Sequence, residues 1–247
     1  ASTLAGALTN TDANDALSLT VNAEDGGATT DAADLVALNS DTSLAITLAA
    51  GLTSITGSFA EANSIYVTNA SDYTGEGDEA VTLDDADVSA ANVDAIANAT
   101  SGVVTATITT GAVTTTLNAI GNVDANDVIR FTTNDTSVDA SDLNDLDALV
   151  DTSDYTSVTG ITEAVIGIGA SAAEVTGALT VLGDGDETVA ITGGAISAAD
   201  ANTIANATSG VVTATVTAAA ASTLVGALTD TDANDALSLT VNAEDGG

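Results

Sequence analysis

Closely spaced carboxylates are the side chains of this sequence most able to do chemistry. They lie in short acidic stretches (DAND, EGDE and DGDE) whose Gly, Asn and Asp residues favour turns. Ca²⁺ takes roughly six to eight oxygen ligands from carboxylates, carbonyls and water, so each stretch is a candidate calcium turn. The candidate ligands are Asp12, Asp15, Asp78, Glu79, Asp124, Asp127, Asp184, Asp186, Glu187, Asp232 and Asp235.

The same turns have an interpretation that needs no metal. Asp and Asn side chains stabilise turns by accepting hydrogen bonds from nearby backbone N–H groups. The acidic stretches complete neither the EF-hand loop nor the glycine-rich nonapeptide of RTX repeats. Glu24 and Asp25, in NAEDGG, could add carboxylates to a neighbouring turn or belong to a flexible Gly-Gly loop. Calcium binding and self-stabilised turns therefore remain alternatives.

Catalytic side chains are scarce. The sequence has no His, Cys or Lys, so most acid–base and nucleophilic mechanisms lack their participants. Paired carboxylates can hydrolyse glycosides, but 36 acidic residues produce such pairs by chance, and aromatic residues that would hold a sugar are few. We expect no enzyme, and a glycan-active β-helix enzyme is the alternative.

Charge narrows the possible partners. The formal net charge is −35, with Arg130 as the single base, so the chain repels nucleic acid and anionic membranes. We expect neither as a partner. No apolar run approaches the roughly 20 residues that span a bilayer, so no membrane insertion is expected. Mobile salt or bound cations must offset the repulsion between the carboxylates.

Internal repeats show which elements position the acidic turns. Residues 221–247 repeat residues 1–27 with two differences, which gives a unit of 220 residues. A second match, at an offset of 108 residues, begins at Asp78 and Asp186 and runs to Asp124 and Asp232. The predicted parts are a first half-repeat, 1–111, a second half-repeat, 112–220, and the start of the next repeat, 221–247.

A smaller subunit of about 48 residues fits the spacing of the acidic turns. It contains a turn, a strand, a short helix ended by Gly102 or Gly210, and two further strands such as 103–109 and 113–120. Leu35 and Leu38, or Val93 and Ile96, lie three apart on a helix face. The helix starts are indicated by cap-like pairs: Asp31/Asp34, Ser89/Asn92, Asp139/Asp142, Ser197/Asp200 and, in the strict form, Ser171/Glu174.

Three strands and one helix in each subunit predict a mainly β fold. We expect solenoid-like stacked repeats of short strands, with short helices along one side and with neighbours covering each other's apolar edges. Tandem β-sandwich domains are the alternative, because each half-repeat is also about as long as a sandwich domain.

The stretches SAADANTIANATSGVVTATVT and ASAAEVTGALT resemble repeats of giant acidic bacterial surface and fibre proteins, of the cyanobacterial or RTX-adhesin-like kind. The resemblance implies an extracellular or cell-surface location and a structural or adhesive role that often depends on calcium. We therefore expect a structural repeat segment of a filament, stalk or surface layer that associates with itself. A calcium-dependent adhesin repeat is the alternative.

Overall fold

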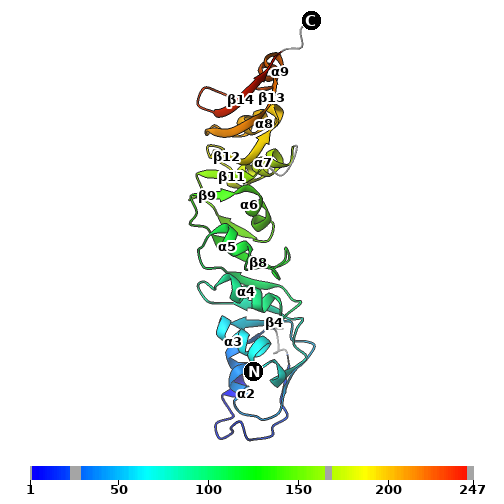
Figure 1. Ribbon diagram of the computed structural model, residues 1–247. Coiled ribbons are helices and arrows are strands. Elements are labelled where there is room, and N and C mark those ends of the chain that lie inside the picture. The colour runs from blue at the N-terminus through cyan, green and yellow to red at the C-terminus, as the bar shows by residue number, and fades with distance from the viewer. Residues whose placement is uncertain (1, 23–28, 165–168, 244–247) are drawn as a thin grey trace. The chain divides into compact units, whose positions relative to one another are not determined.

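Helices and parallel strands alternate along the chain, as the computed structural model in Figure 1 shows for residues 2–22, 29–164 and 169–243. Every strand pair with a recorded register is parallel. The fold is therefore α/β, and the expected mainly β fold, solenoid-like or sandwich, is wrong. Parallel neighbours cannot be joined by a tight hairpin, and helices provide many of the crossovers between them.

Contacts divide the chain into two compact units. The first comprises Ala1–Thr110, Asn118–Thr132 and Leu149–Ser153, and the second comprises Gly111–Leu117, Thr133–Ala148 and Asp154–Gly247. The half-repeat boundaries rest on sequence identity and stay a prediction.

The first unit contains a three-stranded sheet with the order β1-β3-β5 and a six-stranded sheet with the order β10-β8-β7-β6-β4-β2, in which β10 runs from Thr152 to Asp154. Its other strands are β1 (Thr20–Val21), β2 (Thr29–Asp31), β3 (Ile46–Leu48), β4 (Ser54–Gly57), β5 (Tyr73–Thr74), β6 (Ala80–Leu83), β7 (Val104–Thr107) and β8 (Val128–Thr132). Its helices are α1 (Ser2–Ala5), α2 (Ala32–Asn39), α3 (Phe59–Asn63), the π-helix η1 (Ser64–Thr68), the 3-10 helix η2 (Ala70–Asp72) and α4 (Ala90–Ala97).

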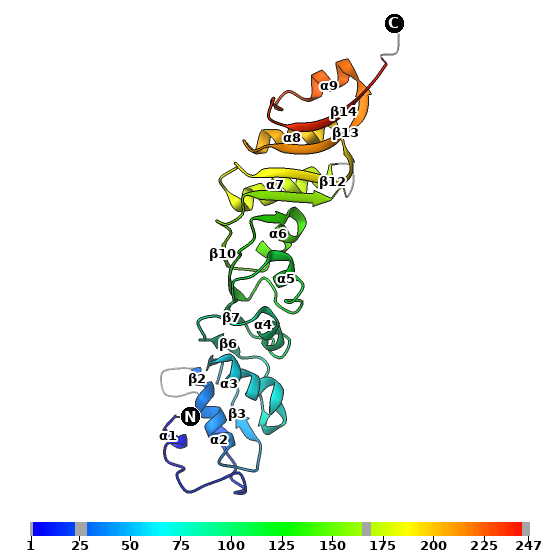
Figure 2. The same ribbon diagram turned by 60° about the vertical axis from the view of Figure 1, so that its left-hand side comes forward.

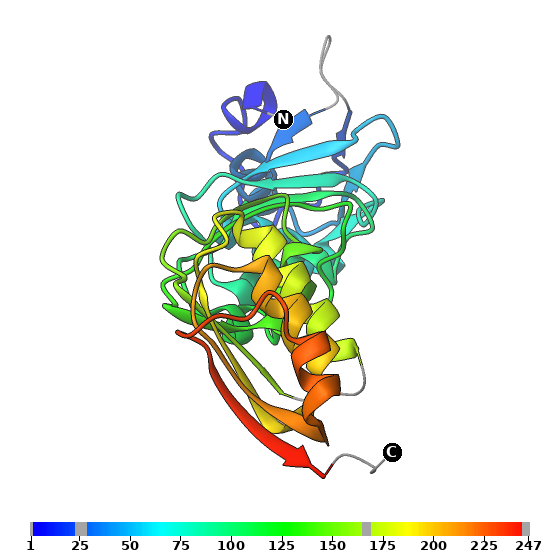
Figure 3. The same ribbon diagram turned by 90° about the horizontal axis from the view of Figure 1, so that it is seen from above.

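The second unit contains one sheet with the order β14-β13-β12-β11-β9. Its helices contact one another in sequence order and stack on one side of this sheet (Figure 3). The strands are β9 (Ser137–Asp139), β11 (Gly160–Ala164), β12 (Thr188–Ile196), β13 (Val212–Ala220) and β14 (Ala236–Asn242). The helices are α5 (Val113–Leu117), α6 (Ala140–Asp147), α7 (Ala170–Leu182), α8 (Ala198–Ala207) and α9 (Ala221–Ala227).

The strand register shows a step shorter than the predicted 48-residue subunit. Val81 pairs with Val104 and Val189 pairs with Val212, which in both cases lies 23 residues later. A step of this length contains one strand and one helix in the turn of chain from β12 to β13 (Figure 2). The acidic stretches overestimated the step because in each of these pairs they precede only the first strand, whereas a TSG loop leads into the second, β7 or β13.

The core is aliphatic and follows the expected periodicities. Ile129 and Phe131 of β8 are buried, whereas Val128 and Arg130 on the opposite face are exposed. On the helices, the predicted inward pairs are confirmed: Leu35, Leu38, Val93 and Ile96 are all fully buried. Aliphatic side chains therefore fill most of the space between sheet and helices, with a few aromatic residues such as Phe131.

Four of the five predicted helix caps are confirmed. The side chains of Asp31, Ser89, Asp139 and Ser197 each accept a backbone N–H at the start of the helix that follows. The prediction at Ser171 is wrong, because α7 already begins at Ala170, with Gly169 in the cap position. The strict capping box forms instead at Ser58, where Glu61 returns a hydrogen bond to the cap backbone.

Two further local predictions are wrong. Residues 113–117 form α5 although four of the five are β-branched and a strand was expected. The carboxylate of Asp135 accepts the Val113 N–H at 2.8 Å and satisfies a donor that the helix leaves open. The helices α4 and α8 end before Gly102 and Gly210, so these glycines do not stop them. No helix among the described residues has the length and apolarity to cross a membrane.

Candidate metal centre

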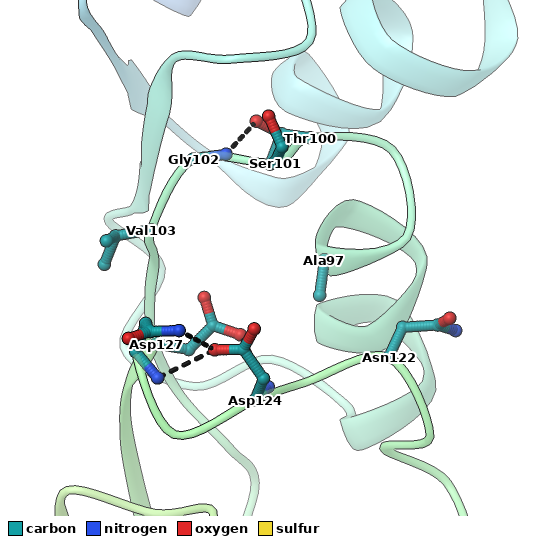
Figure 4. A pocket seen from close by; sticks show the side chains of 9 residues that line it. Ala97, Thr100, Ser101, Gly102, Val103, Asn122, Asp124 and Asp127 are labelled. Carbon is teal, nitrogen blue, oxygen red and sulfur yellow. Dashed lines mark hydrogen bonds between the residues drawn. The ribbon is translucent and has the colours of Figure 1, made fainter.

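The DAND turn at Asp124–Asp127 binds its own backbone. Asp124 Oδ1 accepts the backbone N–H of Asn126 at 2.7 Å and its side-chain amide at 3.0 Å (Figure 4). Asp127 Oδ2 accepts the N–H of Asp124 at 3.0 Å. Asp127 Oδ1 reaches the preceding strand and accepts the N–H of Val104 at 2.7 Å. These carboxylates join the turn to the strand that it follows.

A pocket of about 330 Å³ lies beside this turn. It is enclosed by the loop that follows α4, including Thr100 and Gly102, and by the turn that carries Asp124 and Asp127 (Figure 4). Its carboxylates already accept backbone hydrogen bonds, and Asp124 is exposed to solvent. The pocket therefore has the chemistry of a gap between packed loops.

The other two DAND turns repeat these bonds. The N–H of Asp232 binds Asp235 Oδ2 at 3.0 Å, and the N–H of Val212 binds Asp235 Oδ1 at 2.8 Å. The N–H of Asp12 likewise binds Asp15 Oδ2 at 3.0 Å. Six of the candidate calcium ligands thus have backbone partners, which is what self-stabilised turns require.

The EGDE turn buries a carboxylate that has two donors. Glu79 is buried, and its Oε2 accepts the N–H of Gly77 at 2.9 Å and the hydroxyl of Tyr66 at 3.2 Å. Burial, followed by the charge of Glu79, raises the pKa of Tyr66 well above its usual range, so the hydroxyl keeps the proton that it donates. Asp78 points to solvent. The buried carboxylate of Glu79 therefore has two hydrogen-bond donors within the fold.

The equivalent DGDE turn differs, because its buried carboxylate has no donor. One oxygen each of Asp184, Asp186 and Glu187 lie within 4.8 Å of one another. Glu187 is only 1% exposed, and neither of its carboxylate oxygens accepts a hydrogen bond from the described residues. Gly183 and Gly185 hold the turn in left-handed conformations, with φ of 86° and 66°, which other residues rarely adopt.

Electrostatics make this the strongest candidate metal centre among the described residues. Burial raises the pKa of Glu187 to about 7, and its contact with Asp184 and the charges of Asp184 and Asp186 add to the rise. The same contact lowers the pKa of Asp184. Near neutral pH, a proton or a cation must offset the buried charge. Three carboxylates could bind Ca²⁺, with water completing the shell on the exposed side of Asp184 and Asp186.

One buried carboxylate lies outside the acidic turns and was missed. Glu163, in β11, is buried, and its Oε2 accepts no hydrogen bond from the described residues. Burial, with the charges of Asp139 and Glu174, raises its pKa. An acidic residue inside the apolar stretch GITEAVI was the available signal. Glu24 and Asp25, the remaining acidic candidates, lie outside the described residues.

Comparisons with known proteins identify no relative. No protein-family model matches the chain, and neither a curated protein nor a solved structure matches it.

Proposed function

We propose that the chain is a non-catalytic structural repeat segment of an extracellular filament, stalk or surface layer, whose main partner is another copy of the same repeat. The observation that supports this proposal is the burial of the repeated segment. In the first copy, Val21 is 3% exposed and Leu4 is 38% exposed; in the second copy, Val241 is 58% exposed and Leu224 is 4% exposed. The two copies bury opposite faces.

Neighbouring elements account for this difference. In the first copy, the segment is followed by the chain around β3, which covers the face that buries Val21. The N–H of Ala49 donates to the carbonyl of Val21 at 2.9 Å. In the second copy, the segment is preceded by β13 and α8. Leu224 is buried on the face that meets these preceding elements. A copy with neighbours on both sides would bury both faces, which is the property of a stacking repeat.

A reciprocal exchange of side chains supports the same interpretation. In the first unit, Asp94 of α4 accepts hydrogen bonds from the backbone and side chain of Asn122, at 2.6 and 2.9 Å. In the second unit, the equivalent pair is Asn202 and Asp230, which bond at 2.6 and 2.7 Å with the acid and amide exchanged. Each contact keeps one carboxylate and one amide, so two facing charges are avoided.

The charge of the chain suits an external array. At −35, neighbouring copies repel one another laterally until salt or cations screen the charge. A filament or layer with this surface would stay soluble and would respond to the ionic strength of its surroundings. The sequence resemblance to bacterial surface repeats supports the extracellular location.

A calcium-dependent adhesin repeat is the second candidate, and the Glu187 site favours it. A buried carboxylate without a donor is destabilising unless a proton or cation binds it. In this alternative, Ca²⁺ at Asp184, Asp186 and Glu187 stiffens the second unit, and a different part of the protein binds the target.

Small-angle scattering of chains with one, two and three consecutive 220-residue units tests the structural role. A stacking array predicts a maximum dimension that grows in proportion to the number of units. A compact globule would instead increase its radius of gyration by only about 1.5-fold for a threefold longer chain. That weak growth, measured in salt high enough to screen the carboxylates, would rule out the proposal.

A further inference from the structure

The single basic residue of the chain lies on an uncharged face of the first unit. Arg130 is exposed on β8, on the same side of the strand as the exposed Val128. On the neighbouring strand β7, Thr107 pairs with Arg130 and Thr105 pairs with Val128. The side chains beside Arg130 on this face are therefore hydroxyl and methyl groups, which do not neutralise a guanidinium.

Arg130 has no side-chain partner in the part of the chain that the structure describes. Its guanidinium forms no ion pair with a carboxylate there and donates no hydrogen bond. A guanidinium has five N–H donors and stays charged at any pH at which the protein is folded. Arg130 is therefore available to bind a carboxylate from outside its own unit.

The DGDE turn of the second unit has the complementary property. Asp184 and Asp186 are exposed, and the adjoining Glu187 is 1% exposed with no donor to either oxygen among the described residues. A guanidinium bound at this turn would supply both positive charge and N–H donors. The EGDE turn needs such a partner less, because Glu79 already accepts two hydrogen bonds.

We propose that Arg130 of one copy binds the exposed carboxylates of Asp184 and Asp186 in a second copy of this chain, so that neighbouring copies associate side by side. This inference rests on the proposed structural role, and it names the contact that would join separate arrays into a layer. Arg130 and the DGDE turn are different surfaces, so each copy can donate one contact and accept another. Such a heterologous contact can extend from copy to copy.

Ionic strength sets the conditions for this contact, because each copy carries a net charge of −35. At about 0.15 M salt the Debye length is about 8 Å, so the repulsion between distant carboxylates is screened while a guanidinium touching a carboxylate is still attracted. We expect association to be strongest near this ionic strength. It should weaken at about 0.01 M salt, where repulsion reaches about 30 Å, and at about 1 M salt, where the ion pair itself is screened.

Sedimentation equilibrium in EDTA and about 0.15 M salt tests the two partners separately. Arg130→Gln and Asp186→Asn should each lower the association constant at least about fivefold, which is the upper range for an exposed ion pair. The matched control is Asp78→Asn, at the equivalent position of the EGDE turn. It also removes one negative charge, but it should leave association unchanged or slightly stronger, because it only reduces the repulsion between copies.

Charge exchange between chains tests whether the pair joins two copies. Arg130→Glu chains and Asp186→Lys chains should each associate more weakly than wild type, and an equimolar mixture should regain association, because opposite charges then meet at both positions. An ion pair within one chain could not be restored by mixing. Thermal melts show whether each variant is folded.

Three outcomes would overturn the proposal: a wild type that stays monomeric at a concentration on the order of millimolar, equal effects of Asp186→Asn and Asp78→Asn, or a mixture that associates no better than its components. The growth of covalently joined units with unit number does not require Arg130. Failure of the lateral contact would therefore leave the proposed structural role standing.

Discussion

Glu187→Gln is expected to stabilise the metal-free protein at about pH 8 and to remove its response to pH and calcium. The wild-type carboxylate is buried with no donor, and its pKa is raised from 4.5 to about 7. A carboxyl with a raised pKa in the folded state stabilises the fold fully below its ordinary pKa, and this stability is lost as the pH rises through about 7. A neutral amide avoids the buried charge.

The size of the effect follows from that pKa shift. At about 1.4 kcal/mol per pKa unit, wild type should lose about 3 kcal/mol of unfolding free energy between about pH 4.5 and 8, and Glu187→Gln should keep most of it. Thermal melts of EDTA-treated protein across this pH range measure the difference. A wild type whose midpoint has the same pH dependence as that of the variant would contradict the assignment of the raised pKa to Glu187.

Glu79→Gln is the matched control, because Glu79 occupies the equivalent position and already accepts two donors. Its replacement should destabilise the protein by about 1–2 kcal/mol, since hydrogen bonds to a charged acceptor weaken. The same substitution should thus change stability in opposite directions in the two units.

Calcium added at about pH 8 should raise the midpoint of wild type and of Glu79→Gln, but not of Glu187→Gln. If the wild-type midpoint responds to pH but not to calcium, a proton and not Ca²⁺ offsets the charge of Glu187, and the calcium-dependent alternative is wrong.

Gly102→Ala is expected to cost about 3 kcal/mol or more, because the new methyl group has no space. A Cβ at this position would lie 2.2 Å from the carbonyl oxygen of Glu79, a backbone atom that cannot move independently. Thr100 holds Gly102 close to the backbone of Glu79. Its hydroxyl donates to the Glu79 carbonyl at 2.8 Å and accepts the N–H of Gly102 at 3.0 Å. Chemical denaturation measures the loss.

Gly121→Ala is the control in the same unit. A Cβ there meets no atom within 4 Å, and the backbone φ is not positive, so the change should stay within about 0.5 kcal/mol. Gly210→Ala should reproduce the large loss in the second unit, where the Cβ would lie 2.1 Å from the carbonyl oxygen of Glu187. Equal effects at Gly102 and Gly121 would show that close backbone approach does not fix the loop.

Local signals in the sequence predicted local structure well. The caps at Asp31, Ser89, Asp139 and Ser197 and the buried helix pairs depend on residues a few positions apart, and they form as expected. The prediction of the fold class was wrong because the fold class depends on contacts between residues that are far apart in the sequence. The Val113–Leu117 helix is stabilised by Asp135, which lies 22 residues from Val113, and no local propensity shows this.

The residues of the candidate site could be predicted from the sequence, but the difference between their surroundings in the two units could not. The acidic turns grouped Asp184, Asp186 and Glu187, but Glu79 and Glu187 were equal candidates as metal ligands. The structure separates them, because Tyr66 donates to Glu79 and the described residues offer Glu187 no donor. A signal existed: the match between half-repeats begins at Asp78 and Asp186, so Tyr66 lies outside it.

The central claim is that each repeat completes the exposed edge of the one before it. Amide hydrogen exchange in a chain with two consecutive 220-residue units tests this claim most directly. We predict that protection of Ala236–Asn242 rises at least about tenfold over the present chain, which corresponds to about 1.4 kcal/mol. β12, which already has strands on both sides, should not change. Unchanged exchange at Ala236–Asn242 would contradict the claim.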